Sequence, residues 1–276
     1  MQKQAVTFGC YVLIASAFSA FFRWVQNLAA FELETGLMKP GIFWSKVALV
    51  ITALALIGVA VQVRRLWYKG HYPAQTYDKL IQGNPYLLDR ITKVIAAVMI
   101  VGAVINMFIG SYSVYRSILG LLSVLAIGTA VAFVKLSQLP YEEKQNPLMH
   151  SLLALVPVVF YVDWLTVSYR IHAAMPSVWA YAPEIIAICA SLIGVFYFAG
   201  YAFEYPHPYL AMGWLMAGAI LSLTTIMDDR NIGQQLMLAA GAAMQMYDVW
   251  MIVTSLSDQW PEEAEVPEGD GTTNTQ

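Results

Sequence analysis

Apolar residues occur along most of the chain in long runs, separated by short polar stretches that often contain Pro or Gly. A helix needs about 20 predominantly apolar residues to cross the roughly 30 Å hydrocarbon core of a bilayer. Eight runs reach that length, so the pattern predicts an all-α membrane bundle of about eight transmembrane helices. The predicted spans are approximately residues 5–31, 42–63, 91–112, 117–137, 148–174, 178–203, 208–227 and 233–256.

The connections between these spans are short, and several contain residues that end helices. Pro176 follows the fifth span, and Pro206 and Pro208 separate the sixth from the seventh. Asn84-Pro85 has the pattern of an N-cap followed by a first-turn proline. We therefore expect the third helix to begin near Pro85, before it enters the membrane. The first run is too long and too aromatic for a signal peptide.

Composition agrees with a membrane protein and excludes soluble enzyme folds. Residues of the set AVILMFWYC make up 59% of the 276 residues, and only 12% are Asp, Glu, Lys or Arg. Soluble domains contain about 45–50% apolar and about 25% charged residues. So few charges could not cover this much apolar surface in water. The expected surroundings are a lipid bilayer.

Lys and Arg are distributed unequally between the loops, and cytoplasmic loops are usually enriched in them. With the N-terminus inside, nine of the 15 lie on the inner side, six of these between Arg64 and Lys93. We therefore expect both termini in the cytoplasm. Residues 1–257 are expected to form the transmembrane domain. The acidic residues 258–276, rich in Pro, Glu, Gly and Thr, are expected to form a disordered cytoplasmic tail.

Short similar segments recur in the same order in the first and second half of the chain, which suggests two four-helix repeats, residues 1–140 and 141–257. Halves of four spans each would be parallel and related by an axis along the membrane normal. The paired segments are 22–25 with 162–165, 55–59 with 191–195, and 101–105 with 217–221.

Ionisable residues are costly at membrane depth and usually face the interior of a bundle. The sequence places Arg23, Asp163, Glu184 and Asp248 there. Arg23 and Asp163 each precede a tryptophan at similar depth in the outer half. If the two halves are related, Arg23 and Asp163 are expected to face each other across the axis.

Other polar residues extend this outer-half patch. Asn27 shares a helix face with Arg23, and Thr166 shares one with Asp163. The patch is interpreted as a structural ion-pair network, as a solute or proton site, or as residues that reach lipid headgroups. The residues expected to bind or gate a ligand are Arg23, Asn27, Asn106, Asp163, Thr166 and Glu184. In the third span, Gly102, Asn106 and Gly110 form a stripe that favours close helix contact.

In the last span, Gln245 and Asp248 lie on one helix face in the inner half. Neighbouring alanines leave room for a close helix crossing. Two roles are open for this pair: a hydrogen-bonded contact between helices, or a proton relay.

No signature of a cofactor, metal or nucleic acid is present. The four histidines have no partner at metal-ligand spacing, and a nucleotide-binding loop is absent. Basic stripes with interleaved aromatic residues are absent as well, which excludes nucleic acid as an expected partner. Cys10 and Cys189 lie inside apolar runs, so we expect no disulfide framework.

Two segments resemble known membrane families whose essential residues are missing. Residues 161–165 and 247–249 resemble the counter-ion segment and last-helix aspartate turn of microbial rhodopsins. That family carries its retinal lysine four residues after the aspartate, where this chain has Ile252, so retinal binding is rejected. Asp163 and Asp248 also resemble the acids of a diaspartyl intramembrane protease. The Gly-x-Gly-Asp turn of that family is missing, so this assignment is rejected too.

Residues 22–27 and 31–37 resemble a segment of uncharacterised multi-pass proteins from Gram-positive anaerobic bacteria. The resemblance implies a bacterial plasma membrane and carries no activity. The expected function is non-enzymatic: a small-solute or ion transport-like protein with an outer-half polar pocket. The alternative is an accessory or anchor subunit that docks a cytoplasmic or membrane protein partner through residues 64–93 and the acidic tail.

Overall fold

The computed structural model describes residues 2–31, 39, 43–68, 74, 77–80, 85–110, 114–138, 147–173 and 178–256, and its regular elements are all helical. The long helices are α1 (Gln2–Ala30), α2 (Phe43–Tyr68), α4 (Pro85–Gly110), α5 (Arg116–Gln138), α6 (Pro147–His172), α7 (Val178–Ala199), α8 (Pro208–Thr224) and α9 (Ile232–Thr254). Three short elements accompany them: α3 (Tyr77–Leu80), η2 (Gly200–Phe203) and η3 (Thr225–Met227).

Eight helices of the described chain are long and apolar enough to cross a membrane, and they coincide with the eight predicted spans. The third begins at Pro85, which confirms the expected early start. The protein is therefore an integral multi-pass membrane protein. The proposed N-cap Asn84, most of the loop after Tyr68 and the acidic tail 258–276 lie outside the described residues.

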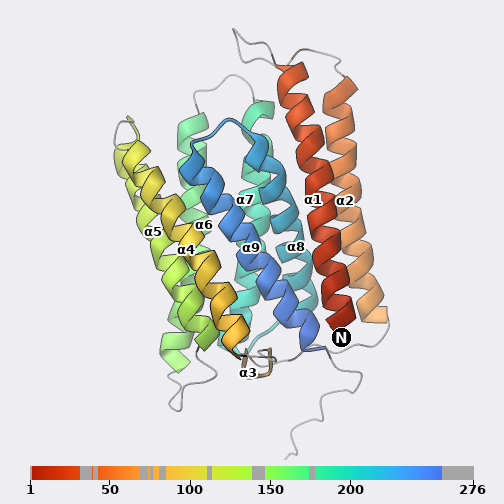
Figure 1. Cartoon of the computed structure of the whole chain (residues 1–276), viewed down its shortest axis with the longest axis vertical. Helices are drawn as coiled ribbons and strands as arrows, with labels where there is room; N and C mark the ends of the chain where they lie inside the picture. The colour runs from red at the N-terminus through yellow and green to blue at the C-terminus, as the bar shows by residue number, and fades with distance from the viewer. Residues whose placement is uncertain are drawn as a thin grey trace, which may run out of the picture.

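Six helices, α4 to α9, form a closed ring in which each packs against the next and α9 returns to α4. The α1–α2 hairpin lies outside this ring, with α1 against α8 and α9 and with α2 against α8 (Figure 1). Both ends of the described chain lie at one face of the bundle, which we call the terminal face. The opposite face, which holds the α8–α9 connection, is called the distal face.

Close approach of α9 to α4 depends on two glycines. A Cβ on Gly233 would lie 2.7 Å from the carbonyl oxygen of Gly102, closer than van der Waals contact allows. Farther along α4, a Cβ on Gly110 would lie 3.1 Å from Leu119 of α5. The close helix contact predicted for the stripe of small residues on α4 is thus confirmed.

The helices of the two predicted halves correspond in only some of their neighbours. α7 packs extensively against α8, whereas their counterparts α2 and α4 share no comparable contact within the described residues. The four-plus-four repeat therefore stays a prediction from the sequence.

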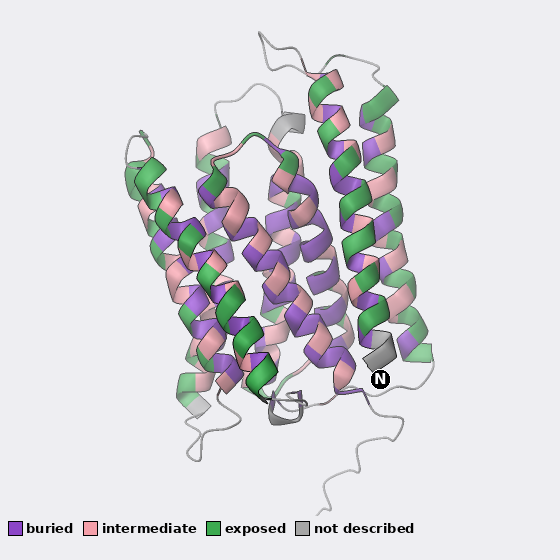
Figure 2. Ribbon diagram, in the orientation of Figure 1, coloured by how far each residue is buried: buried purple, intermediate pink, exposed green. Residues whose placement is uncertain are grey.

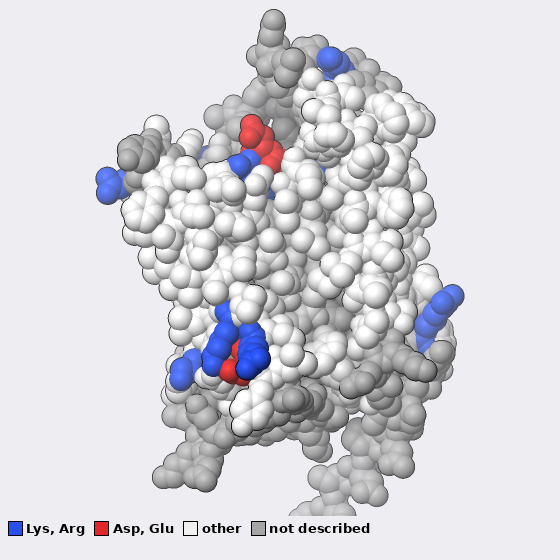
Figure 3. All heavy atoms as spheres, viewed as in Figure 1, with Lys and Arg blue, Asp and Glu red and all other residues white. Residues whose placement is uncertain are grey.

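Burial falls from the centre of the bundle to its edge (Figure 2). Within their most apolar windows, 72% of α9 is buried inside the protein but only 17% of α2. Large apolar side chains such as Leu28 and Phe108 are exposed, as expected where a helix faces lipid. On the face shown in Figure 3, charged side chains gather at two levels and leave a broad uncharged band between them.

Candidate functional site

The connection between α8 and α9 brings charged residues into the bundle. After η3 the chain runs through Asp228, Asp229 and Arg230 to Asn231, whose side chain caps α9 by accepting a hydrogen bond from the Gln234 amide at 2.9 Å. This connection is short, so its polar side chains stay close to the helix ends. The side chains of Asp228 and Arg230 are only 9% and 7% exposed.

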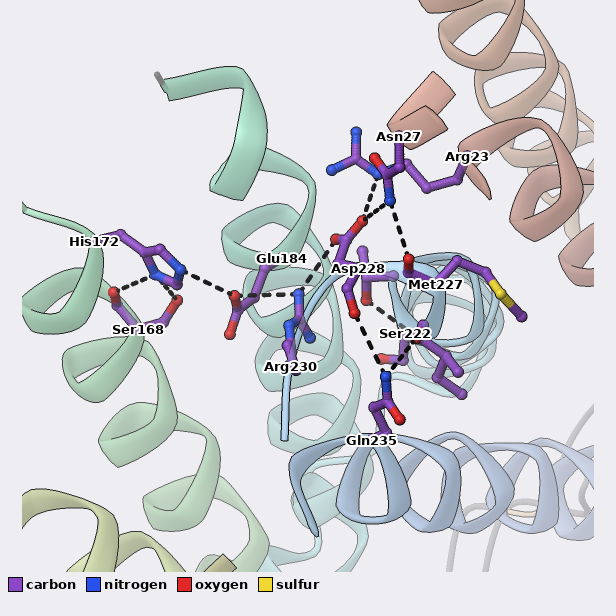
Figure 4. A network of polar contacts seen from close by, with 12 residues as sticks. Arg23, Asn27, Ser168, His172, Glu184, Ser222, Met227, Asp228, Arg230 and Gln235 are labelled. Carbon is purple, nitrogen blue, oxygen red and sulfur yellow. Dashed lines mark hydrogen bonds and ion pairs between the residues drawn. The ribbon is translucent and has the colours of Figure 1, made fainter. Parts of the chain in front are cut away.

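The Asp228 carboxylate accepts hydrogen bonds from two residues of α1 and from Arg230 of its own loop (Figure 4). The Arg23 Nε atom lies 2.7 Å from Asp228 Oδ1, and Asn27 Nδ2 donates to the same oxygen at 3.0 Å. Arg230 lies 3.4 Å from the second carboxylate oxygen. Arg23 also donates to Gln26 Oε1 at 3.1 Å. The aspartate therefore ties α1 to the α8–α9 connection.

Arg230 extends this network to α7 and α6. Its guanidinium lies 3.1 Å from Glu184 Oε2, and His172 Nε2 lies 4.0 Å from the same oxygen. The His172 ring stacks on Tyr181 with centroids 5.0 Å apart. We call Arg23, Asn27, His172, Glu184, Asp228 and Arg230 the distal network. Its two arginines and two carboxylates balance in charge, and buried charges are expected to be paired in this way.

Three of the six residues predicted to bind or gate a ligand therefore come together: Arg23, Asn27 and Glu184. The predicted facing of Arg23 and Asp163 is wrong, because Arg23 pairs with Asp228. Asp163 is half-buried and its Oδ2 atom has no partner in the described structure. Thr166 is exposed, and its hydroxyl donates to Val162 O of its own helix. Asp163 and Thr166 lie on α6, which does not pack extensively against α1 in the described chain.

Asn106 lies apart from the charges and joins helices. Its amide donates to Ser123 Oγ at 2.9 Å and to Leu119 O at 3.3 Å, both on α5. Its carbonyl oxygen accepts from Asn231 at 3.0 Å, at the start of α9. With all these bonds inside the bundle, Asn106 holds α4, α5 and α9 together.

Gln245 makes the predicted helix contact in the other half of the bundle. Its Nε2 atom donates to the Tyr161 hydroxyl at 2.9 Å and so joins α9 to α6. Asp248, one turn farther along α9, is buried beside a small cavity inside the ring.

A cleft of about 400 Å³ adjoins the distal network between α1, α2, α7 and α8. Arg23 and Gln26 line it from α1, and the exposed Lys46 lines it from α2. Most other lining residues are apolar, among them Ala53, Leu56 and Ile186. We call this space the distal cleft. Its combination of cationic and apolar walls suits an amphipathic molecule.

Comparison with known protein families, curated proteins and solved structures finds no match. The resemblance to proteins of Gram-positive anaerobes therefore gains no support. Within the described residues, no group of three or more His, Cys, Asp or Glu side chains could hold a metal ion.

Asp228, Arg230 and His172 are the residues of the distal network that sequence reasoning missed. Asp228 and Arg230 fall between the predicted spans 208–227 and 233–256, so they were not counted among the ionisable residues at membrane depth. The sequence did contain a signal for Asp228 and Arg230: they carry opposite charges in a connection too short to extend far from the bundle.

Proposed function

We propose that this protein is a transport-like membrane protein that binds a small amphipathic anion in the distal cleft. The observation that carries the proposal is the cleft itself, with Arg23 and Lys46 on its wall beside a mostly apolar surface. Its volume of about 400 Å³ falls within the usual range of small-molecule sites.

Charge in the cleft favours an anion. Arg23 is balanced by Asp228, whereas Lys46 makes no ion pair within the described chain. One positive charge therefore remains on the wall of the cleft, and the described residues that line the cleft include no carboxylate. An anion with an apolar body, such as a long-chain carboxylate, would neutralise Lys46 and cover the apolar wall.

Access to the cleft is from the side of the bundle. Leu49 and Ile186 line it and are exposed on α2 and α7. We propose that the membrane is a bacterial plasma membrane with both termini in the cytoplasm, supported by the distribution of Lys and Arg. In that orientation the distal cleft opens into the outer leaflet.

Binding of a radiolabelled long-chain fatty acid to the purified protein in lipid nanodiscs tests the proposal. Ala53→Trp fills the cleft and Lys46→Gln removes its charge, so each should weaken binding about tenfold or more, equivalent to about 1.4 kcal/mol. Matched controls are Ala97→Trp, on an exposed face of α4, and Lys135→Gln, at the terminal end of α5. Both controls should bind as wild type.

Uptake of the same fatty acid into proteoliposomes distinguishes transport from binding. Binding without uptake would reduce the proposal to a lipid-binding protein. Saturable binding that Ala53→Trp and Lys46→Gln leave unchanged would contradict the cleft as the site. Failure of the wild type to bind would favour the accessory-subunit alternative.

A further inference from the structure

A second polar site lies inside the six-helix ring, toward the terminal face and separate from the distal cleft. A cavity of about 30 Å³ is lined by residues of α4, α5, α6, α7 and α9 and of the short elements α3 and η2. One water needs about 10–15 Å³ on this measure, so the cavity has room for two. We call it the ring cavity. Of the described residues that line it, Asp248 is the one carboxylate.

Among the described residues that line this cavity, none carries a positive charge. The titratable residues that line it besides Asp248 are Tyr77 from α3, Tyr161 from α6 and Tyr247 from α9. The lining residues from α4, α5, α7 and η2 are apolar or carry hydroxyl groups. Asp248 itself is 6% exposed and makes no hydrogen bond or ion pair within the described chain. An ionised carboxylate in these surroundings would carry a large desolvation penalty.

Two other buried polar atoms on the cavity wall have no hydrogen-bond partner in the described structure. Thr129 is 1% exposed and Gln245 is fully buried, and neither Thr129 Oγ1 nor Gln245 Oε1 has a hydrogen-bond partner in the described structure. Buried polar atoms are nearly always hydrogen-bonded to protein or to ordered water. A cavity with a carboxyl, a hydroxyl and an amide on its wall is polar and large enough to hold water.

Further hydroxyl groups lie between this cavity and the distal network. Gln245 donates to Tyr161. A Cβ on Gly218 would touch both Gln245 Oε1 and Ser191 Oγ, so both atoms lie close to that glycine. Ser191 Oγ is 3.3 Å from Ser222 Oγ, and Thr225 donates to Ser222 O at 3.1 Å. Polar groups therefore continue from Asp248 toward the loop of Asp228.

We propose that Asp248 is a reversible proton-binding site, served by water in the ring cavity. A hydronium ion in the cavity gives its proton to a carboxylate oxygen of Asp248, leaving a neutral carboxyl and a water molecule, and the reverse step releases the proton. The neutral carboxyl donates a hydrogen bond to cavity water and needs no counter-ion. This site is independent of the fatty-acid binding proposed for the distal cleft.

Infrared spectroscopy of the protein in nanodiscs tests this inference, because a neutral carboxyl has a carbonyl stretch that a carboxylate lacks. A neutral-carboxyl band at neutral pH should disappear in Asp248→Asn and persist in Asp163→Asn. Transfer to heavy water should shift the band, since cavity water exchanges the proton. Raising the pH should abolish the band, and lowering it again should restore it.

Thr129→Val provides a second variant that keeps the carboxyl and removes one polar neighbour. It should shift the frequency of the band without removing it, so the inference stays testable if Asp248→Asn does not fold. A spectrum of Asp248→Asn identical to wild type would overturn the inference. The inference would also be overturned if the neutral-carboxyl band is present in buffer without sodium or potassium and is lost when sodium is added at constant pH. The site would then bind a metal cation.

Discussion

Asp228→Asn tests the structural role of the distal network. Asp228 accepts from Arg23 at 2.7 Å, from Asn27 at 3.0 Å and from Arg230 at 3.4 Å. The substitution keeps the size of the side chain and removes its charge. Arg23, whose side chain is 5% exposed, is then left without its carboxylate. Removing one partner of a buried ion pair costs about 3–5 kcal/mol.

Because of the contacts of Arg230, we expect the loss in free energy of unfolding to lie near the lower end of that range. Arg230 keeps Glu184 at 3.1 Å, so only Arg23 loses its carboxylate. We expect Asp228→Asn to lower the free energy of unfolding by about 3 kcal/mol. The double variant Arg23→Gln/Asp228→Asn should lose less free energy of unfolding than the two single variants lose together. The difference should be about 1 kcal/mol or more, because the two residues contact each other.

Unfolding by sodium dodecyl sulfate in mixed micelles measures these differences. Asp229→Asn is the matched control, because Asp229 is the exposed neighbour of Asp228. Its substitution should change the free energy of unfolding by no more than about 0.5 kcal/mol. The role assigned to the ion pair would be refuted if Asp228→Asn and Asp229→Asn lowered the free energy of unfolding equally. It would also be refuted if the losses of Asp228→Asn and Arg23→Gln were strictly additive in the double variant.

Three further substitutions are tested by the same unfolding titration. Gly233→Ala should destabilise the protein by about 1–3 kcal/mol, because its Cβ would press on the α4 backbone. Gly120→Ala is the control: a Cβ at Gly120 would have no atom within 4 Å, so this substitution should cause no loss of stability. Tyr161→Phe should cost about 1 kcal/mol by removing the acceptor of Gln245, and wild-type stability would contradict that bond. Asp163→Asn should cause no measurable loss, since Oδ2 lacks a partner in the described structure, and a large loss would contradict that description.

The membrane spans could be predicted from the sequence because their length is set by the thickness of the bilayer. The neighbours of each helix could not be predicted in this way. Arg23 and Asp163 were predicted at similar depth, but depth does not specify the direction around the bundle in which a side chain points. Arg23 pairs with a residue 205 positions away, on a loop whose location depends on how α8 and α9 pack.

The candidate site was therefore predicted in part. Glu184 and Asn27 were identified because polar residues in apolar helices usually face the interior. Asn106 was recognised by the glycines on either side of it, although its bonds join helices rather than form a pocket. The distal cleft could not be predicted, because it exists only where the α1–α2 hairpin meets the ring.

The position of the α1–α2 hairpin outside the ring also has a consequence for synthesis. Arg23 enters the membrane in the first helix, and Asp228 is made 205 residues later. At about 5–20 residues per second, roughly 10–40 s separate the two. During that interval Arg23 must reach water or lipid headgroups, and its place near the end of α1 allows this. The first hairpin can therefore insert early, but it acquires its final neighbours only when the last loop of the bundle has been translated.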